Sequence, residues 1–367
     1  MREIANYQET EDRPQNRIGA LDGVRGLAIA LVVISHAHIG VLPFGAPVGV
    51  TLFFVLSGYL ITGILIRQLD QRRYSLVGFY QRRARRLLPG LMVLLIASLI
   101  LRLWLGNLED WWTEAWPVIF YATNYKVLLD GWSSMGHFGH LWSLAVEEHF
   151  YLVWPMVLLL LPIRRRERAI AALIAILGLW RLWLLAVSPD WNRVYLGSDT
   201  NAFALLIGAL LACKPFPQFP KVASWGSLLF LVGLSSMSVD TMASAVLSVA
   251  GVVACAVLVH TGSGGWRPME LRGLRWLGLI SYELYLWQGL IFGWRVHWVW
   301  QVAGAVGLGW FTWNFIGKRF LQNPSAHHLR AAPQGTTSVS APTDALSDVA
   351  GLRVASAGHT APSSAEG

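Results

Sequence analysis

The chain has 367 residues, of which 54% are hydrophobic and 14% are charged, and its formal net charge at pH 7 is +8. Its mean hydropathy of +0.47 lies well outside the usual range of a soluble globular domain. This composition excludes an ordinary soluble enzyme and indicates an all-α integral membrane protein.

Apolar runs recur along the chain, and most of them are long enough to cross a hydrocarbon core of about 30 Å as a helix. We predict a bundle of about ten transmembrane helices, at residues 18–39, 47–67, 89–106, 141–162, 169–187, 201–213, 222–238, 243–262, 276–293 and 297–316. Residues 1–17 are predicted to be a polar cytoplasmic tail and residues 18–324 the transmembrane domain. Residues 325–367, which are rich in Ala, Ser, Thr, Pro and Gly, are predicted to be a disordered cytoplasmic tail.

The positions of the cations predict the orientation of this bundle. If the N-terminus lies in the cytoplasm, most of the 29 Lys and Arg residues fall in inner segments and few fall in outer loops. This asymmetry follows the positive-inside rule, so we expect both termini to be cytoplasmic and the protein to be a multi-pass component of a bacterial cytoplasmic membrane. Topology thus explains the positive charge, and no nucleic-acid partner is expected. The oligomeric state stays open.

No metal site is predicted from the residue types that usually form one. The two cysteines, Cys213 and Cys255, lie at apolar span positions and form no spacing motif. His137 and His140 have the side chains of metal ligands, but no third ligand follows at a recognisable spacing.

Two polar residues interrupt the first apolar run, GVRGLAIALVVISHAHIG. Arg25 and His36 are eleven residues apart, so in an α-helix their side chains lie about 20° apart on one face and about 16 Å apart along the axis. A cation and an imidazole on one face of a membrane helix commonly face a protein interior or a wet cavity. The alternative is that Arg25 snorkels to a lipid headgroup and His36 marks the outer interface.

A dense cluster of charge, FYQRRARRLLP at residues 79–89, holds Arg82, Arg83, Arg85 and Arg86 in what we predict to be an inner loop. Guanidinium groups at this density are suited to bidentate contacts with phosphates. The alternative is topogenic charge that contacts anionic lipid.

The segment GHFGHLWSLAVEEHFYLVWP, residues 136–155, places Glu147 in an otherwise apolar helix start. Because the fourth span runs inward, we expect Glu147 at a depth like that of His36. A carboxylate beside an imidazole fixes its tautomer and raises its basicity, as a general base needs. The alternative is that, of the neighbouring Glu147 and Glu148, one is interfacial and the other forms a structural ion pair with Arg102 or Arg181.

Two other stretches predict packing or a cavity without a specific chemistry. Ser57-Gly58 in TLFFVLSGYLIT lacks the G-x-S-x-G frame of a nucleophile elbow and indicates a close approach of helices. Polar residues also punctuate the apolar span LGLISYELYLWQ and indicate a lined cavity; they are Ser281, Tyr282, Glu283 and Gln288.

The segments LDGVRGLAIALVVISHA, GVTLFFVLSGYLIT, FYQRRARRLLP, HLWSLAVEEHFYLVWP, a degenerate SDTNAFALLIGALLA and ISYELYLWQ follow one another along the chain. In this order they resemble the membrane acyltransferase-3 family over about residues 18–324. The resemblance implies a membrane bundle that transfers acyl groups, often acetyl, to hydroxyls of polysaccharides, cell-wall glycans, lipids or macrolides.

The resemblance also implies roles for four residues. Arg25 and His36 match the essential pair of the family, with His36 as the general base. His140 and Glu147 match the segment HxWSLxVE. We therefore expect these four residues to be catalytic.

The RxxR motif of the family, which the resemblance assigns to the acyl-CoA donor, falls in the arginine cluster. It maps onto either Arg82 with Arg85 or Arg83 with Arg86, and the doubled arginines leave the register open. All four are therefore candidate donor-binding residues, and acyl-CoA is the expected donor without a metal cofactor.

Several positions depart from the usual pattern of the family. Asn201 and Phe203 stand where many members have Arg and Asp, and Gln288 replaces a common His. Gln322 stands in place of a common Glu near the end of the last span. These changes predict a specialised acceptor site or a divergent branch.

The resemblance thus implies a membrane O-acyltransferase that moves an acyl group, expected to be acetyl, from acyl-CoA to a hydroxyl of a glycan, a glycolipid or a macrolide-type small molecule. We expect direct transfer, in which His36, oriented by Glu147, takes the proton of the acceptor hydroxyl and Arg25 stabilises the oxyanion. Because His36 and the arginine cluster are predicted on opposite sides of the membrane, an acyl-enzyme relay or a deep inward cavity stays open. The alternative functions are a proton-coupled transporter or flippase and a catalytically degenerate homologue.

Overall fold

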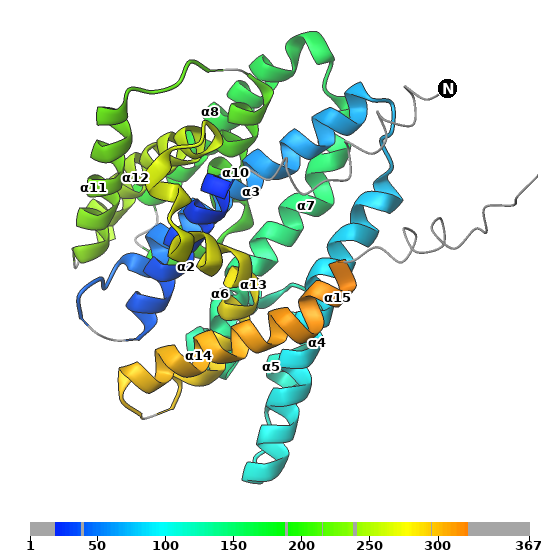
Figure 1. Cartoon of the computed structure of the whole chain (residues 1–367), viewed down its shortest axis with the longest axis vertical. Coiled ribbons are helices and arrows are strands. Elements are labelled where there is room, and N and C mark those ends of the chain that lie inside the picture. Colours follow the sequence, from blue (N-terminus) through cyan, green and yellow to red (C-terminus); the bar gives the residue numbers. More distant parts are fainter. Residues whose placement is uncertain are drawn as a thin grey trace, which may run out of the picture. The chain divides into compact units, whose positions relative to one another are not determined.

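The computed structural model describes residues 19–37, 40–187, 190–214, 216–237, 241–294 and 296–321, and the side chains of these residues other than 241–248 and 321. The predicted tails at residues 1–17 and 325–367 lie outside the described residues, and so does Gln322. Every regular element in the described ranges is helical (Figure 1), as predicted.

The helices, in chain order, are α2 (Gly19–His36), α3 (Gly45–Asp70), α4 (Leu76–Leu105), α5 (Trp111–Ile119), α6 (Thr123–Asp130), η2 (Trp132–Leu141), α7 (Trp142–Leu160), η3 (Ile163–Arg165), α8 (Arg166–Val187), α9 (Trp191–Leu196), α10 (Ser198–Cys213), α11 (Lys221–Ser236), α12 (Thr241–Ser263), η4 (Arg267–Glu270), α13 (Arg272–Phe292), α14 (Trp298–Thr312), η5 (Trp313–Gly317) and α15 (Lys318–Leu321).

Five helical segments in the described ranges are long and apolar enough to cross a membrane, and they overlap the first five predicted spans. They are Gly19–His36, Gly45–Asp70, Leu76–Leu105, Trp132–Leu160 and Ile163–Val187. Shorter apolar helices occupy the next three predicted spans, and α13 and α14 occupy the last two. The membrane character is therefore supported, whereas the number of about ten spans and the cytoplasmic location of both termini stay predictions.

The third helix differs from its prediction, because α4 begins at Leu76 and not near residue 89. The Ser75 hydroxyl caps it by accepting a hydrogen bond of 3.1 Å from the Gly78 N–H. Arginine is also a good helix former, so the charged stretch extends the helix. The arginine cluster is therefore part of a helix that runs into the bundle, and not an inner loop.

Close helix contacts form the centre of the bundle, where α2 packs against α13 and α3 packs against α10. A Cβ atom on Gly26 would lie 1.9 Å from the Leu274 carbonyl oxygen, and one on Gly58 would lie 1.8 Å from the Leu205 carbonyl oxygen. Only glycine fits at such distances, so backbone meets backbone at both contacts. The predicted close approach at Gly58 is confirmed.

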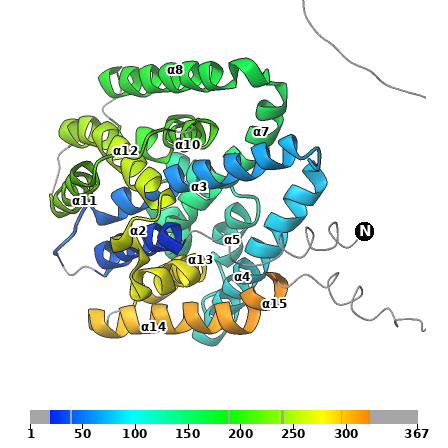
Figure 2. The ribbon, with the colours of Figure 1, turned by 45° about the horizontal axis from the view of Figure 1, so that its top comes forward.

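Other helices lie at the periphery. Figure 2 shows α8 and α14 at opposite edges of the bundle, with α2, α3 and α13 between them. Only 17% of the most apolar window of the α8 segment is buried, against 61% for α2. An apolar but exposed helix is suited to face lipid, whereas α2 is positioned to carry a site.

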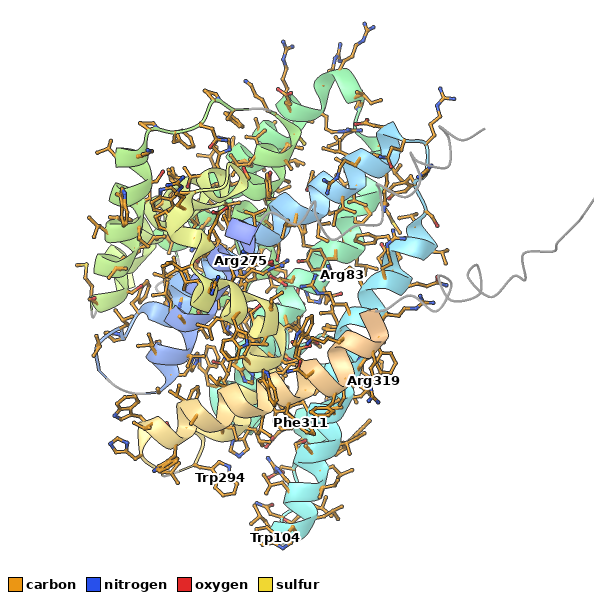
Figure 3. The ribbon with its side chains drawn as sticks, in the orientation of Figure 1. Arg83, Trp104, Arg275, Trp294, Phe311 and Arg319 are labelled. Atoms are coloured by element: carbon orange, nitrogen blue, oxygen red, sulfur yellow. The ribbon has the colours of Figure 1, made fainter. Side chains whose placement is uncertain are left out.

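The hairpin of α2 and α3 defines the two ends of the bundle. His36 ends α2, and the hairpin leads directly into α3, so the His36 end lies opposite the last turn of α3, which carries Arg67. Figure 3 shows Trp104 and Trp294 toward one end of the view and Arg275, at the start of α13, farther from it. Trp104 is 79% exposed, as expected for an aromatic side chain at a membrane interface.

Candidate active site

Three cavities follow one another through the bundle from the Arg67 end to the His36 end. The basic cavity, of about 620 Å³, includes Asp22, Arg25, Arg67 and Lys214 in its lining. The central cavity, of about 190 Å³, includes Arg25, Ser57, Arg83, Arg86, Glu147 and Tyr285. The imidazole cavity, of about 320 Å³, includes His36, His137, His140, Tyr285 and Gln288. Because Arg25 lines the first two and Tyr285 lines the last two, the three cavities adjoin one another.

The basic cavity gathers cations from separate helix ends. Arg67 comes from the last turn of α3 and Lys214 follows the end of α10, and both are exposed where they line the cavity. Arg25 reaches it from α2, where its guanidinium lies 3.3 Å from the Asp22 carboxylate. Three cations around one opening are suited to an anionic ligand.

The central cavity contains a carboxylate held by hydroxyl groups. The Ser57 hydroxyl donates to Glu147 Oε1 at 2.9 Å, and the Tyr151 hydroxyl donates to Glu147 Oε2 at 3.4 Å. Ser57 stands beside Gly58, where α3 approaches α10 closely, so its position is fixed by backbone packing. Glu147 is thus oriented from both sides.

The arginine cluster separates into two faces of α4. Arg83 and Arg86, three residues apart, line the central cavity, whereas Arg82 and Arg85 do not. Arg83 is half-buried and the other three are exposed. Arg83 donates to Glu148 Oε1 at 2.7 Å, and its guanidinium lies 3.4 Å from the centre of the Tyr151 ring. Ion pairing and stacking hold Arg83 in one orientation, and the geometry favours the register of Arg83 with Arg86.

The imidazole cavity brings together two of the predicted catalytic residues. His36 Nδ1 lies 2.9 Å from the Val32 carbonyl oxygen, and His36 and His140 both line the cavity. The His140 ring fits because Gly289 has no side chain, since a Cβ atom there would lie 2.2 Å from His140 Cε1. Among the described residues, no three His, Cys, Asp or Glu side chains gather as a metal site would require.

Tyr285 stands between the central and imidazole cavities. Its hydroxyl shares a hydrogen bond of 2.6 Å with the Ser143 hydroxyl and donates to the His140 backbone carbonyl. Its ring packs edge-on against the His140 ring, with 5.3 Å between their centres. Tyr285 therefore couples the position of His140 to the helix that carries Glu147.

The predicted catalytic residues thus fall into two pairs. Arg25 and Glu147 line the central cavity, and His36 and His140 line the imidazole cavity. The expected juxtaposition of Glu147 with His36 differs from this arrangement. His140 belongs to η2, which ends before α7 begins at Trp142. Glu147 lies five residues after Trp142, about 8 Å further along the axis of α7.

The alternative ion-pair partners of the glutamates have other contacts. Arg102 donates to both carboxylate oxygens of Glu114, at 2.7 and 2.6 Å, and Arg181 donates to the Thr200 carbonyl at 3.3 Å. The structural ion pair of this segment is instead formed by Glu148 with Arg83.

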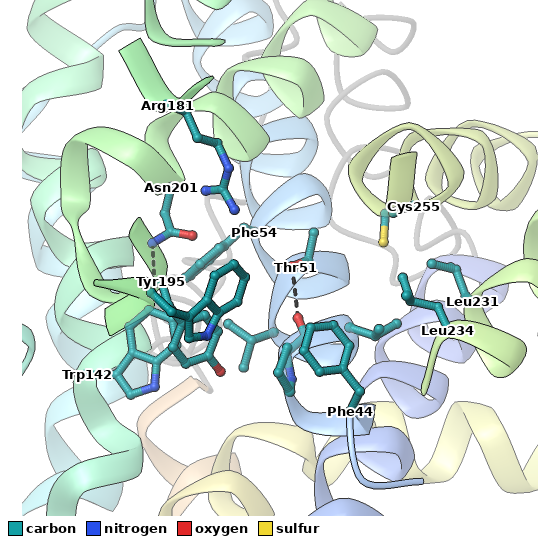
Figure 4. Close-up of a pocket in the computed structure, with 15 residues that line it drawn as sticks. Phe44, Thr51, Phe54, Trp142, Arg181, Tyr195, Asn201, Leu231, Leu234 and Cys255 are labelled. Carbon is teal, nitrogen blue, oxygen red and sulfur yellow. Dashed lines mark hydrogen bonds between the residues drawn. The ribbon is translucent and has the colours of Figure 1, made fainter. Parts of the chain in front are cut away.

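Two of the unusual positions have structural roles, and one of them, Asn201, lines a small pocket of about 30 Å³ (Figure 4). Asn201 donates to the carbonyl oxygens of Tyr195 and Gly197, at 2.7 and 2.8 Å, and so fixes the turn between α9 and α10. Phe203 packs against Gly178 of α8, where a Cβ atom would lie 3.1 Å from its ring. At the two positions where many family members carry a charge, Asn201 thus makes backbone hydrogen bonds and Phe203 makes an apolar contact.

Sequence reasoning missed several residues of the site. The sequence pattern indicates only a packing role for Ser57 and no role for Tyr285, although Tyr285 precedes Gln288 by three residues on one face of α13. For Arg67 and Lys214 the pattern predicts only topogenic charge. The helical spacing of Tyr285 was a usable signal, whereas the convergence of Arg67 with Lys214 depends on tertiary packing.

Residues 18–317 match the family described as an acyltransferase domain, and the chain therefore belongs to the acyltransferase-3 family. It is 33% identical to the peptidoglycan O-acetyltransferase OatA of Listeria monocytogenes over 305 residues, which cover 74% of this chain and 48% of that protein. It is 31% identical to the O-acetyltransferase OatA of Staphylococcus aureus over 297 residues, which cover 73% of this chain and 49% of that protein. No solved structure matches. The chain spans about half the length of these curated relatives.

Proposed function

We propose that the protein is a membrane O-acetyltransferase that moves an acetyl group from acyl-CoA to a hydroxyl of a peptidoglycan-type glycan. The family and the names of the relatives support acetyl transfer and a glycan acceptor. They do not support the macrolide and glycolipid acceptors that the sequence left open. The proposed membrane is the bacterial cytoplasmic membrane.

The observation that carries this proposal is the row of three adjoining cavities. The basic cavity and the Arg83–Arg86 face of α4 offer cations to the phosphates of acyl-CoA. The imidazole cavity offers His36 to the acceptor hydroxyl. Helix α2 connects the basic cavity with the imidazole cavity, because Arg25 and His36 lie about 16 Å apart along it. A deep cavity from the donor side thus favours direct transfer over an acyl-enzyme relay.

In the proposed reaction, the acceptor oxygen attacks the thioester carbonyl carbon while His36 takes the hydroxyl proton. The carbon–sulfur bond breaks as the ester forms, and the CoA thiolate takes up the proton that His36 accepted, which returns His36 to its neutral form. Arg25 lies where the donor passes between two cavities and supplies positive charge along that path. Glu147, oriented by Ser57, and His140, beside Tyr285, position the groups around the thioester and the acceptor.

The test uses the full chain in nanodiscs with acetyl-CoA and a soluble peptidoglycan fragment. Free CoA thiol and the mass of the glycan are measured for the wild type, His36→Ala, Arg86→Ala and the matched exposed variant Arg82→Ala. We expect acetylated glycan with the wild type and Arg82→Ala, and a strong loss with the other two. A folded wild-type protein that neither binds acetyl-CoA nor releases thiol would refute the proposal and favour the transporter or flippase alternative.

A further inference from the structure

The lining of the imidazole cavity includes buried polar atoms that no described residue satisfies. Gln288 is fully buried on α13, and neither its Oε1 nor its Nε2 atom has a hydrogen-bond partner among the described residues. His140 Nε2, which lies in the lining of the same cavity, is also buried without a partner there. Most buried polar groups are paired, so three such atoms around one cavity indicate a ligand that pairs with them.

The charge of the cavity restricts the ligand further. Among the described residues, its lining includes no Lys, Arg, Asp or Glu, in contrast to the basic cavity. Aromatic side chains form much of the wall, including Trp132, Trp142 and Phe292. A largely aromatic wall with a few uncharged polar groups is suited to a neutral ligand with apolar faces and specific hydrogen bonds, such as a sugar ring.

The chemistry of Gln288 selects one group on such a sugar. A carboxamide presents one acceptor and one donor side by side in a plane. A secondary amide has the complementary pair, because its N–H donates to Oε1 while its carbonyl accepts from Nε2. An imidazole, which stands at this position in many family members, does not offer this adjacent pair.

We propose, on the basis of the proposed function, that the imidazole cavity binds an N-acetylated amino sugar through an amide pair between its acetamido group and Gln288. A hydroxyl of the bound sugar would then be presented to His36 and His140, which line the same cavity. Tyr285 lies one helical turn before Gln288, and its hydrogen bonds to α7 and η2 fix this face of α13. Gln288 is thus a specificity-determining residue of the acceptor site.

The test measures binding without a donor, using tri-N-acetylchitotriose and cellotriose, which carry acetamido and hydroxyl groups on the same ring position. The full chain in nanodiscs is titrated with each, as wild type, Gln288→Leu, Gln288→Glu and Gln301→Leu. Gln301 is the matched control, because it is a buried glutamine whose amide donates to the Trp294 carbonyl and does not line the cavity.

We expect the wild type and Gln301→Leu to bind tri-N-acetylchitotriose at least about tenfold more tightly than cellotriose. Gln288→Leu removes both polar atoms and Gln288→Glu removes the donor, so both variants are expected to lose this preference. Equal binding of the two sugars by the wild type, or an unchanged preference in folded Gln288 variants, would overturn the proposal.

The same protein also distinguishes this proposal from the proposed function. A Gln288-dependent acetamido preference without acetyl transfer would contradict the proposed function and leave the binding site intact. Acetyl transfer to both trisaccharides at equal rates would leave the enzymatic function intact and overturn the amide pair.

Discussion

The position of His140 depends on the absence of a side chain at Gly289, and this dependence can be tested by Gly289→Ala. A Cβ atom there would lie 2.2 Å from His140 Cε1, 2.3 Å from His140 Nδ1 and 2.3 Å from the His137 carbonyl oxygen. Ordinary van der Waals contact begins at 3.4 Å. Relief of the clash with the ring and with the backbone therefore requires a movement of roughly 1 Å.

The size of this movement sets the expected effect. A misplacement of about 1 Å in a catalytic arrangement can reduce the rate by about 100-fold. Overpacking of a filled contact costs about 1–3 kcal/mol of the free energy of unfolding. Because Tyr285 donates to the His140 backbone carbonyl, the shift also disturbs the boundary between the imidazole and central cavities. We therefore expect a loss of acetyl transfer much larger than the loss of stability implies.

The assay compares acetyl transfer to a glycan fragment with unfolding in detergent for the wild type, Gly289→Ala and Gly273→Ala. Gly273 lies on the same helix, and a Cβ atom there meets nothing within 4 Å, so this control isolates the steric effect. Alanine favours helix by up to about 1 kcal/mol relative to glycine, and Gly273→Ala is expected to retain activity. Wild-type transfer by folded Gly289→Ala would refute the reasoning that the placement of His140 matters.

Three other predictions concern the cavities. Arg67→Gln with Lys214→Gln is expected to raise KM for acetyl-CoA by about tenfold with little change in kcat, and added salt is expected to reduce the difference. Ser57→Ala removes a hydrogen bond to Glu147 and is expected to lower kcat more than it raises KM, with a loss of about 1 kcal/mol in stability. Tyr285→Phe removes both hydrogen bonds of the hydroxyl, and is expected to destabilise by about 1–3 kcal/mol in thermal unfolding.

Each of these has its own control and contradictory result. Arg164→Gln, an exposed cation outside the basic cavity, should leave KM unchanged; an equal effect would assign the loss to general surface charge. Ser57→Thr retains the hydroxyl and should retain more of kcat than Ser57→Ala, and identical losses would argue against the hydrogen bond. Unchanged stability in Tyr285→Phe would show that its hydroxyl does not fix the two helices.

The sequence was sufficient for the fold class and the family, and for Arg25, His36, Glu147 and His140 as candidates, because hydropathy and motif spacing are local properties. It was not sufficient for the depth of Glu147, which depends on where α7 begins. A polar stretch next to an apolar run also resembles a loop, although at Arg83 and Arg86 it continues the helix. In both cases the helix boundary decided the position.

The register of the arginine cluster shows the same limit. Doubled arginines fit the family motif in two ways, and only the face that α4 presents to the bundle separates Arg83 and Arg86 from their neighbours. Lys214 and Arg67 lie far apart in the sequence, and their convergence follows from the contact of α3 with α10. Such contacts depend on glycines at backbone distance, which a hydropathy pattern does not specify.

On the proposed function, the linings of the three cavities explain how transfer can occur across a membrane without either substrate crossing it. Cations at the Arg67 end hold the phosphates of the donor, because an anion is costly to move into an uncharged, aromatic cavity. The neutral acceptor gains hydrogen bonds at the His36 end and has no charge to match the basic cavity. Tyr285, held by two hydrogen bonds, separates the central cavity from the imidazole cavity. Only the slender arm of the donor has to reach past it. The acetyl group therefore passes Tyr285 on the arm of the donor, while the donor phosphates and the acceptor stay on opposite sides of this residue.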